Sequence, residues 1–562
     1  EITTRLVGSE MCIRDRTQSG LFLEVADVDS DGGSVRLSTK KSGTLAERQM
    51  WKLEVVEAQP NYLTEATRDA MMEGWKKNYY NDSQGRLGEG GFWGDAEMFE
   101  VVLDAYEVTG DIQYKTMFDK LHADFIARQG NNWESNDFND DIAWIVIASV
   151  RGYLMTGKQS YLDVAKSNFD MMYERAAVLP HDMLIWNASE NPYGTNSCIN
   201  GPAGVAACYL AIATGDESYY EKARKTYAAQ REYLYKPSTG QVYDSFTWQK
   251  GVPSNYNTWA STYNQGTFLG TAVMLYNHYG DEQYKEDAQM IMKYTREQMC
   301  NEFGVIKVCQ GVVDDQGKLV GDLPGFKGIL MRYVRRFMVD LYQPDCAEWM
   351  AINAFQAYNN RNSDGVSCTA WLTKTVEEYT TYVPFTNYNK DPFGPSTAVS
   401  AAFNSYIGDK TVRKDAFRGI EAENFDYLKG IYTLSVDGVD SPVMGGDNMA
   451  AAAYTGYHNV DFGPYYAKSL EFRVLPQRPN SKIEVYLDSP DGELLGTVTL
   501  PNEQEWQTVA LELLKPLDGM RNIYLKYTRG TGAAKLQLDN FQFKQEGYTS
   551  QDITDNGGTL TT

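Results

Sequence analysis

The chain has 562 residues and a formal net charge of -23, with 75 acidic residues against 52 lysines and arginines. This length predicts two to four domains, at roughly 100–200 residues each. The acidity argues against a nucleic-acid partner, whose phosphates are bound by cations, and equally against an anionic membrane surface. The longest apolar run, residues 142–150, is too short to span a bilayer, so no transmembrane segment is expected. The 39 tyrosines and 11 tryptophans suit either core packing or stacking on sugars.

The N-terminal region divides into two short stretches. The string LVGSEMCIRDR resembles a translated sequencing adapter, so residues 1–16 are left out of the fold prediction. Residues 17–58 contain three short strand patterns, at 21–23, 35–37 and 49–53, separated by Gly, Asp and Ser turns. The Gln49-x-Trp51 motif resembles one repeat of a ricin-type β-trefoil lectin. Since a trefoil needs three repeats, we predict a partial lectin-like segment.

Residues 59–378 have helical periodicity and an internal repeat. Each repeat places a glycine after an apolar helix and a tyrosine four residues later, at the start of the next helix. Gly supplies the left-handed C-cap, and Asp, where present, caps the following helix. Four such hairpins predict a closed ring of paired helices, an (α/α)6 barrel; the alternative is an open α-solenoid. The four motifs begin at Thr109, Thr156, Thr214 and Tyr279.

The remaining chain is predicted to be a linker at 379–416, an all-β sandwich at 417–545 and a polar tail at 546–562. The linker contains Pro, Asn, Ser and Gly, whereas the sandwich shows period-two strands at regular spacing. The expected strands are residues 482–487, 494–500, 507–513, 522–527 and 535–543.

Adjacent carboxylates, Asp140 and Asp141, precede the apolar run in the string NDFNDDIAW. One interpretation is structural: Asn139 or Asp140 caps a helix, and acids favour its positive end. The other is catalytic, because like charges in a cleft push the two pKa values apart, leaving one group ionised and one protonated. A retaining glycosidase needs that division between nucleophile and acid/base.

Several other strings combine glycine with hydrogen-bonding or stacking groups, and in a helical ring they would gather on one face. The strings are GGFWGD, NSCINGP, STYNQG, GFKGI with Arg332, and NNRN. Asp244, in the string QVYD, is a further candidate for a cleft residue.

These strings, in this order, resemble glycoside hydrolase family 76, the endo-α-1,6-mannanases. The resemblance rests on GFWGDAEMFEVVLDAY, NDFNDDIAWIVIA, NSCINGPAG, STYNQGTFLG and GFKGILMRY. It implies an (α/α)6 barrel and retaining hydrolysis of α-1,6-linked mannose without a cofactor, with Asp140 as nucleophile and Asp141 as general acid/base. The residues expected to bind substrate are Trp93, Asn139, Asn200, Tyr263, Asn264, Gln265, Asp244, Lys327 and Arg332.

Residues 417–545 resemble a carbohydrate-binding module of family 6, through the strings IEAENF, NVDFG, VYLDS and LDNF. This resemblance implies that Tyr454 and Trp506 clamp a sugar ring and that Gln537 stands at the ligand-binding asparagine position. It also implies a structural calcium held by Glu421, Glu423 and Asp539, since calcium prefers carboxylate oxygens.

We therefore expect a secreted or cell-surface monomer that cleaves the α-mannan backbone, with the module holding the enzyme on polysaccharide. Two alternatives remain open. One is a transglycosylase of the same fold, which passes the mannosyl group to another sugar. The other is a non-catalytic mannan-binding protein.

Overall fold

The computed structural model describes residues 63–189, 193–307, 323–375, 392–408, 410–446, 449–530 and 532–548, and the backbone of 22–25 and 35–38. The chain forms two compact units, residues 1–61 and 62–562. In the first, β1 (Phe22–Val25) pairs antiparallel with β2 (Val35–Ser38), so two of the predicted strands are confirmed. The strand predicted at 49–53, residues 1–16 and the tail at 549–562 lie outside the described residues.

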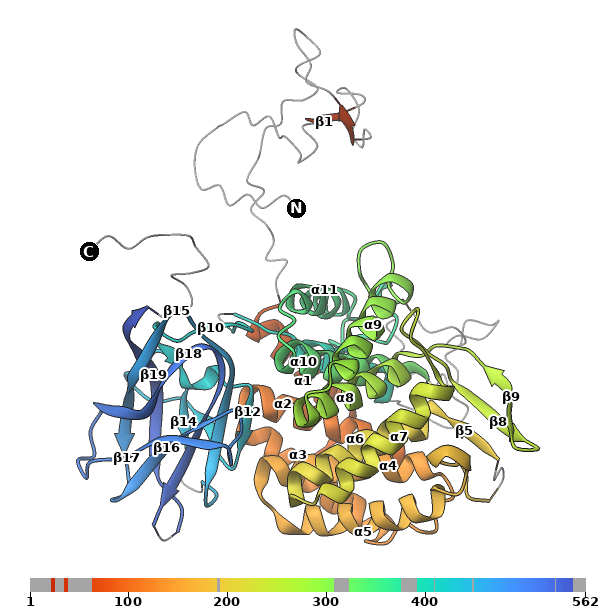
Figure 1. Ribbon diagram of the computed structural model, residues 1–562, viewed down its shortest axis with the longest axis horizontal. Coiled ribbons are helices and arrows are strands. Elements are labelled where there is room, and N and C mark those ends of the chain that lie inside the picture. The colour runs from red at the N-terminus through yellow and green to blue at the C-terminus, as the bar shows by residue number, and fades with distance from the viewer. Residues whose placement is uncertain are drawn as a thin grey trace. The chain divides into compact units, whose positions relative to one another are not determined.

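Twelve α-helices occur in the described part of the second unit, and six of them form a closed inner ring. Figure 1 shows the helices beside the blue strands of the C-terminal part. Each inner helix packs against the next, and the last packs against the first. The predicted all-α barrel is therefore confirmed, and the open solenoid is wrong. The inner helices are α2 (Trp93–Thr109), α4 (Asn139–Thr156), α6 (Ser197–Thr214), α8 (Thr262–Tyr279), α10 (Phe326–Asp340) and α12 (Phe393–Asn404).

The outer helices cover the ring and are amphipathic, with tyrosines and aliphatic residues facing inward. They are α1 (Glu65–Tyr79), α3 (Ile112–Gln129), α5 (Gln159–Ala176), α7 (Glu217–Tyr233), α9 (Glu282–Gln298) and α11 (Asp345–Asn359). Of the described helices, only α6 is long and apolar enough to cross a membrane by length and composition, and 83% of that window is buried inside the fold.

The repeated turn connects inner to outer helices as predicted. Gly110, Gly157, Gly215 and Gly280 are left-handed C-caps with φ between 67° and 75°. After three of these glycines an aspartate side chain caps the next helix by accepting a backbone N–H, as Asp111 does from Gln113 at 2.9 Å. The four inner helices that end in these glycines therefore end at the same face of the ring, and their N-termini lie at the other.

The predicted linker at 379–416 has to be corrected, because α12 lies inside it. Every residue of α12 is buried, and the helix closes the ring between α10 and α2. The Pro, Ser and Gly content that favoured a linker reflects close packing: Gly328 of α10 approaches Ser400 and Thr397 of α12. The helical domain thus extends at least to Asn404.

Charged residues fill part of the ring interior. On α2, Glu97, Glu100, Asp104 and Glu107 share one face. Arg332 of α10 bonds Asp104 and Glu97 at 3.0 and 3.1 Å. This axial ion cluster consists of Glu97, Glu100, Asp104, Glu107, Arg151, Arg332 and Arg335.

The C-terminal part is a β-sandwich, as predicted. Its strands join in the order β13-β14-β19-β15-β18-β16-β17, with β10, β11 and β12 at the margins. The two long strands β15 (Ala453–Pro476) and β18 (Gln507–Arg529) run antiparallel with register shifts that bend them. The others are β10 (Lys414–Asp415), β11 (Ile420–Glu421), β12 (Tyr427–Lys429), β13 (Tyr432–Leu434), β14 (Val443–Gly445), β16 (Ser481–Leu487), β17 (Glu493–Thr499) and β19 (Leu536–Tyr548).

The sandwich docks on the face of the ring where the inner helices end. Backbone N–H groups of Thr433 and Gly430 donate to the carbonyls of Gly110 and Met155, at 3.0 and 2.7 Å. Tyr106 adds a hydrogen bond to the Ile431 carbonyl at 2.9 Å. The opposite face, with the helix N-termini, is left for the candidate site.

Candidate active site

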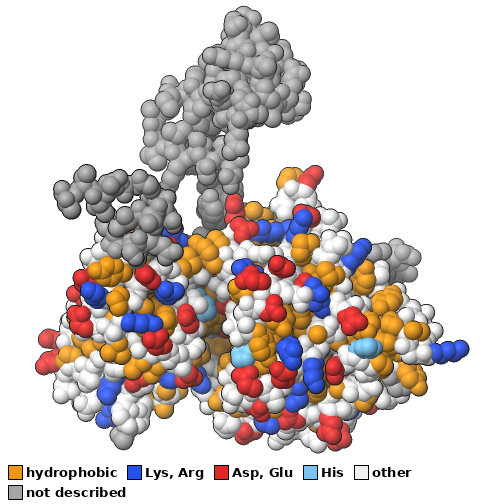
Figure 2. Space-filling view, viewed as in Figure 1, with side chains coloured by type: hydrophobic (Ala, Val, Ile, Leu, Met, Phe, Trp, Pro, Cys, Tyr) orange, Lys and Arg blue, Asp and Glu red, His pale blue; other side chains and the backbone are white. Residues whose placement is uncertain are grey.

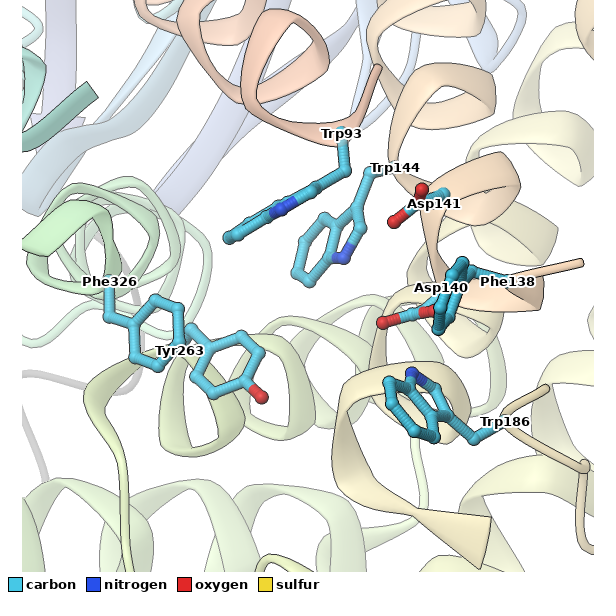
Figure 3. Close-up of a pocket in the computed structure, with 8 residues that line it drawn as sticks. All are labelled: Trp93, Phe138, Asp140, Asp141, Trp144, Trp186, Tyr263 and Phe326. Carbon is cyan, nitrogen blue, oxygen red and sulfur yellow. The ribbon is translucent and has the colours of Figure 1, made fainter. Parts of the chain in front are cut away.

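Asp140 and Asp141 occupy the first turn of α4. The N-cap is Phe138, which makes no side-chain cap, so the expectation that Asn139 or Asp140 caps this helix is wrong. The rest of α4 is almost entirely buried and fixes the first turn against the ring. Both carboxyl groups extend from this turn toward the same side (Figure 3).

A pocket of about 250 Å³ contains both carboxylates. Its walls are mainly aromatic and come from the first turns of α2, α8 and α10 and from the loop after α5. Tyr263 stacks on Phe326 at 3.8 Å between ring centres, and Trp93 meets Phe393 edge-on at 4.8 Å. The lining residues are Trp93, Phe138, Asp140, Asp141, Trp144, Trp186, Tyr263 and Phe326 (Figure 3).

Asp140 lines the pocket and is partly exposed, but its Oδ1 is shielded from solvent. Its Oδ2 accepts a hydrogen bond from the Cys198 thiol at 3.2 Å, while its buried Oδ1 has no partner in the described residues. Burial, followed by the neighbouring charge of Asp141, raises the pKa of Asp140 to about 8. Burial also raises the pKa of Cys198, which keeps the thiol protonated as a donor.

Asp141 accepts a hydrogen bond from Asn136 Nδ2 at 3.0 Å and, like Asp140, is partly exposed. The two adjacent carboxyls therefore differ in their hydrogen-bond partners, and the raised pKa of Asp140 favours the proton on that group in the free protein near neutral pH. One proton held between two carboxyls is what acid/base and nucleophilic work on a glycosidic bond requires.

Of the residues predicted to bind substrate, Trp93 and Tyr263 line the pocket. Asn139, Asn200 and Gln265 are at most 1% exposed, and their side chains hold loops together. Asn139 joins Arg175 to the Ile185 carbonyl, and Gln265 bonds the backbone at 240 and 242. Asn200 binds Thr195 and the backbone of residues 184 and 196. These three are therefore structural in this conformation.

Lys327 and Arg332 are also buried away from the pocket. The Lys327 ammonium donates to the carbonyls of Ile306 and Thr369, and Arg332 belongs to the axial ion cluster. Both follow Phe326, which does reach the pocket, but α10 turns them toward its packed sides. The prediction that they contact substrate is wrong for this structure.

Asp244 and Asn264 lie beside the pocket without lining it. Asp244 accepts hydrogen bonds from Ser245 and Asn257, and burial raises its pKa. Its charge also acts on Cys198, the thiol that binds Asp140. Asn264 is fully buried, and its amide has no hydrogen bond in the described structure.

The candidate strings contain Phe138, Trp144, Cys198 and Phe326 but did not single them out as site residues, and Trp186 lies outside every candidate string. Trp144 stands one helical turn after Asp140, so an i, i+4 search could have found it. Trp186 lies in a loop, and its indole nitrogen turns toward Asp140 (Figure 3), an arrangement that no local pattern marks.

The three residues expected to form the sugar clamp of the sandwich do not meet. Tyr454 stands at the start of β15, opposite Lys526, whereas Trp506 adjoins Gln507, which pairs with Val474 near the other end of that strand. Gln537 pairs with Leu475 and so lies on the Trp506 side, with a buried, unbonded Oε1 in the described structure. Tyr454 faces the helical ring instead.

The expected calcium ligands do lie near one another. Burial and the charge of Asp539 raise the pKa of Glu421, and burial raises that of Glu423 to about 7. Glu423 Oε2 is buried without a described partner, which fits a cation ligand, but Asp539 is engaged by Arg473 at 2.8 Å. No group of three or more metal-ligating residues is assembled among the described residues. The cluster is thus suited to a cation but is not a formed coordination sphere.

Paired carboxylates at one end of a helical ring define a glycosidase-like site, and comparison with known proteins agrees. The model of glycosyl hydrolase family 76 matches residues 61–401, more than half of the chain. The chain therefore belongs to glycosyl hydrolase family 76. A family 6 carbohydrate-binding module matches residues 421–545, as predicted, and neither model covers 17–58.

Solved structures with the same helical fold include an α-1,6-mannanase of Salegentibacter sp. HEL1_6. It is 27% identical, with a TM-score of 0.53, over 60% of this chain and 98% of that one. An inactive variant of that enzyme, with two consecutive aspartates changed to asparagine, is described in complex with α-1,6-mannotriose; its TM-score is 0.52 at 27% identity, over the same shares of both chains.

Curated relatives match over shorter stretches. An endo-1,4-β-xylanase A of Thermoclostridium stercorarium is 31% identical over 137 residues, 24% of this chain. An arabinoxylan arabinofuranohydrolase of Paenibacillus polymyxa is 29% identical over 129 residues, 22% of this chain. This chain spans a quarter or less of the length of these relatives.

The pKa of Asp140 predicts a pH-dependent stability. We expect Asp140→Asn to raise the free energy of unfolding at pH 7 by about 1–3 kcal/mol. Between the ordinary carboxyl pKa of 3.8 and about 8, the folded wild type holds a proton that the unfolded chain has lost. Wild-type stability therefore falls as pH rises through this window, whereas the amide does not titrate.

Urea denaturation at pH 4, 5.5 and 7 measures this effect. The advantage of Asp140→Asn should shrink toward zero at pH 4, and Asp163→Asn, on the exposed face of α5, should match wild type throughout. If Asp140→Asn raised the free energy of unfolding by the same amount at all three pH values, the result would contradict a raised pKa of Asp140.

Proposed function

We propose that the protein is a retaining endo-α-1,6-mannanase that cleaves the backbone of α-mannan. The observation that carries this proposal is the Asp140–Asp141 pair in one aromatic pocket, with burial and like charge favouring one shared proton. Aromatic walls suit the apolar faces of sugar rings. The family and the described mannanase relative support the linkage.

In the proposed mechanism, Asp141 donates a proton to the glycosidic oxygen while Asp140 attacks the anomeric carbon. The carbon–oxygen bond breaks, the leaving sugar takes the proton, and a mannosyl ester forms on Asp140. Asp141, now a carboxylate, then removes a proton from water, and the water oxygen attacks the anomeric carbon. The bond between that carbon and Asp140 breaks, Asp140 leaves as a carboxylate, and the mannosyl chain is released with its original α configuration.

Because the free protein favours the proton on Asp140, substrate binding has to transfer that proton to Asp141 before attack. Asp140 would then be the ionised nucleophile, and the Cys198 thiol would donate to its charge. A sugar hydroxyl placed beside Asp140 would stabilise the same ionised form.

Incubation with linear α-1,6-mannan tests the function. Wild type should give short α-mannosides, and Asp140→Ala should give none. Elongated products would favour a transglycosylase. No conversion by wild type, with retention of the protein on immobilised mannan, would overturn the enzymatic proposal in favour of a binding protein.

We propose that the chain works as a secreted or surface-attached monomer, since polysaccharide is met outside the cell.

We also propose that the Glu421–Glu423–Asp539 cluster binds calcium and stabilises the sandwich. Millimolar calcium should raise the melting temperature by about 2–5 °C through binding to the folded state. Glu423→Gln should abolish that shift, and Glu512→Gln, an exposed acid elsewhere in the sandwich, should keep it. An equal calcium response in both variants would contradict the assignment.

A further inference from the structure

A second cavity, of about 640 Å³, lies between the helical ring and the sandwich. Its walls are the last turns of α4, α6, α8 and α10 on one side and β12, β15, β18 and the loop after β16 on the other. A hollow is visible in this region of the surface in Figure 2. The volume falls within the range of about 300–1,000 Å³ typical of ligand sites. We call it the interdomain cavity.

The interdomain cavity is distinct from the candidate active site. Asp140 lies in the first turn of α4, whereas Leu154 and Met155, in the last turn of that helix, line the cavity. With a rise of about 1.5 Å per residue, roughly 20 Å of helix separates the two. A ligand in one site therefore does not occupy the other.

Tyrosine rings dominate the cavity walls, and their positions are fixed by contacts. Tyr209 from the ring and Tyr427 from the sandwich hold the Arg336 guanidinium between them, at 5.3 and 5.5 Å from the ring centres. Tyr454 meets Tyr524 edge-on at 5.8 Å. The lining tyrosines are Tyr209, Tyr220, Tyr276, Tyr427, Tyr454 and Tyr524.

Most charged groups of the cavity are neutralised within its walls. Arg336 pairs with Asp340 at 3.4 Å, and Asp340 also accepts hydrogen bonds from Tyr427 and Asn277, at 2.6 and 3.0 Å. Arg151 pairs with Glu107 at 3.2 Å. The cavity thus offers no free cation for a phosphate or carboxylate among its described residues, which argues against an anionic ligand.

Uncharged hydrogen-bonding groups remain available. The hydroxyls of Tyr209, Tyr220 and Tyr454 have no hydrogen-bond partner in the described structure, and Asp488 lines the sandwich wall without an ion-pair partner there. Aromatic faces beside free hydroxyls and one acceptor carboxylate match the alternating apolar and polar surface of a sugar ring.

We propose that the interdomain cavity binds a neutral oligosaccharide, as a second sugar site formed jointly by the helical ring and the sandwich. Tyr454 would stack on a sugar ring, and Tyr209 and Tyr220 would bond its hydroxyls. The choice of α-1,6-mannotriose as the first probe rests on the proposed function; the site itself rests on the cavity.

Calorimetric titration of Asp140→Asn/Asp141→Asn, which does not consume substrate, tests the proposal with α-1,6-mannotriose, xylotriose and cellotriose. At least one trisaccharide should bind, and Tyr454→Ala should weaken that binding at least tenfold. Tyr209→Phe, which removes one hydroxyl and keeps the ring, should weaken it less. Trp93→Ala, in the active-site pocket, and Trp506→Ala, at the far end of β15, should leave this binding unchanged.

Three results would overturn the inference. They are no cavity binding of any of the three sugars, unchanged binding of all three in folded Tyr454→Ala and Tyr209→Phe, or loss of this binding in Trp506→Ala instead. Thermal melting of each variant identifies misfolding, and Tyr454→Phe gives a second variant if Tyr454→Ala fails to fold. The test also separates the inference from the proposed function. Mannan cleavage without cavity binding overturns only the inference, and cavity binding of another sugar without mannan cleavage overturns only the function.

Discussion

Replacement of Asp140 by alanine should lower the rate of the proposed α-1,6-mannan cleavage by about 10³-fold or more, because the proposed covalent mannosyl ester could not form. Replacement of Asp141 lowers it by about 10²–10⁴-fold, through loss of acid/base catalysis. Reducing-end release from mannan measures both effects. Asp163→Ala, an exposed acid on α5, should retain wild-type activity.

Azide and an activated aryl mannoside separate the two roles. With Asp140 absent, azide takes the nucleophile's place and gives the β-mannosyl azide. With Asp141 absent, the ester still forms from a good leaving group, and azide attacks it to give the α-mannosyl azide. The reverse pattern of anomers would exchange the two roles, and no azide product from either variant would contradict double displacement.

Arg332→Met should destabilise the helical domain by about 3–5 kcal/mol, since it leaves buried carboxylates without their cation. Arg332 contacts Asp104, Glu97 and Glu100, and the side chains of all four are at most 4% exposed. Burial and the neighbouring Glu100 raise the pKa of Glu97 to about 8. Glu97 is therefore protonated at neutral pH, and this limits the excess negative charge of the axial ion cluster.

Urea denaturation followed by tryptophan fluorescence measures this loss. Arg224→Met removes an exposed pair with Glu221, in which both side chains are about half exposed, and should cost less than about 1 kcal/mol. Equal losses in the two variants would show that the axial ion cluster adds nothing beyond a surface pair. Mannanase activity at low temperature should survive Arg332→Met if this arginine acts in stability and not in substrate contact.

The sequence predicted the helical ring because its turns obey local rules. Gly110 and Asp111 terminate one helix and begin the next through caps that depend on neighbouring residues alone. Helix starts are harder to place from the sequence: α8 begins at Thr262, and the polar residues of its first turn obscure the apolar period. Those first turns contribute the pocket, so the functional residues lie where periodicity is weakest.

The candidate site was only partly predictable, because the direction in which a side chain points matters as well as the position of its residue in the sequence. Lys327 follows Phe326 directly, yet only the phenylalanine reaches the pocket. Trp186 and Cys198 come from segments far from Asp140 along the chain, and their contact with it depends on ring closure. Tyr454 and Trp506 were paired by resemblance, whereas the course of β15 separates them.

The glycine turns that end the inner helices have a consequence for how the two domains can diverge in sequence. At Gly110 and Met155 the sandwich is held by main-chain hydrogen bonds, which are available whatever side chains the neighbouring residues carry. Substitutions can therefore accumulate on either side of this contact without undoing it, provided that Gly110 keeps its left-handed backbone (φ 67°). These two contacts are thus independent of side-chain identity, whereas the Tyr106–Ile431 and Tyr427–Asp340 hydrogen bonds across the same interface require their side chains.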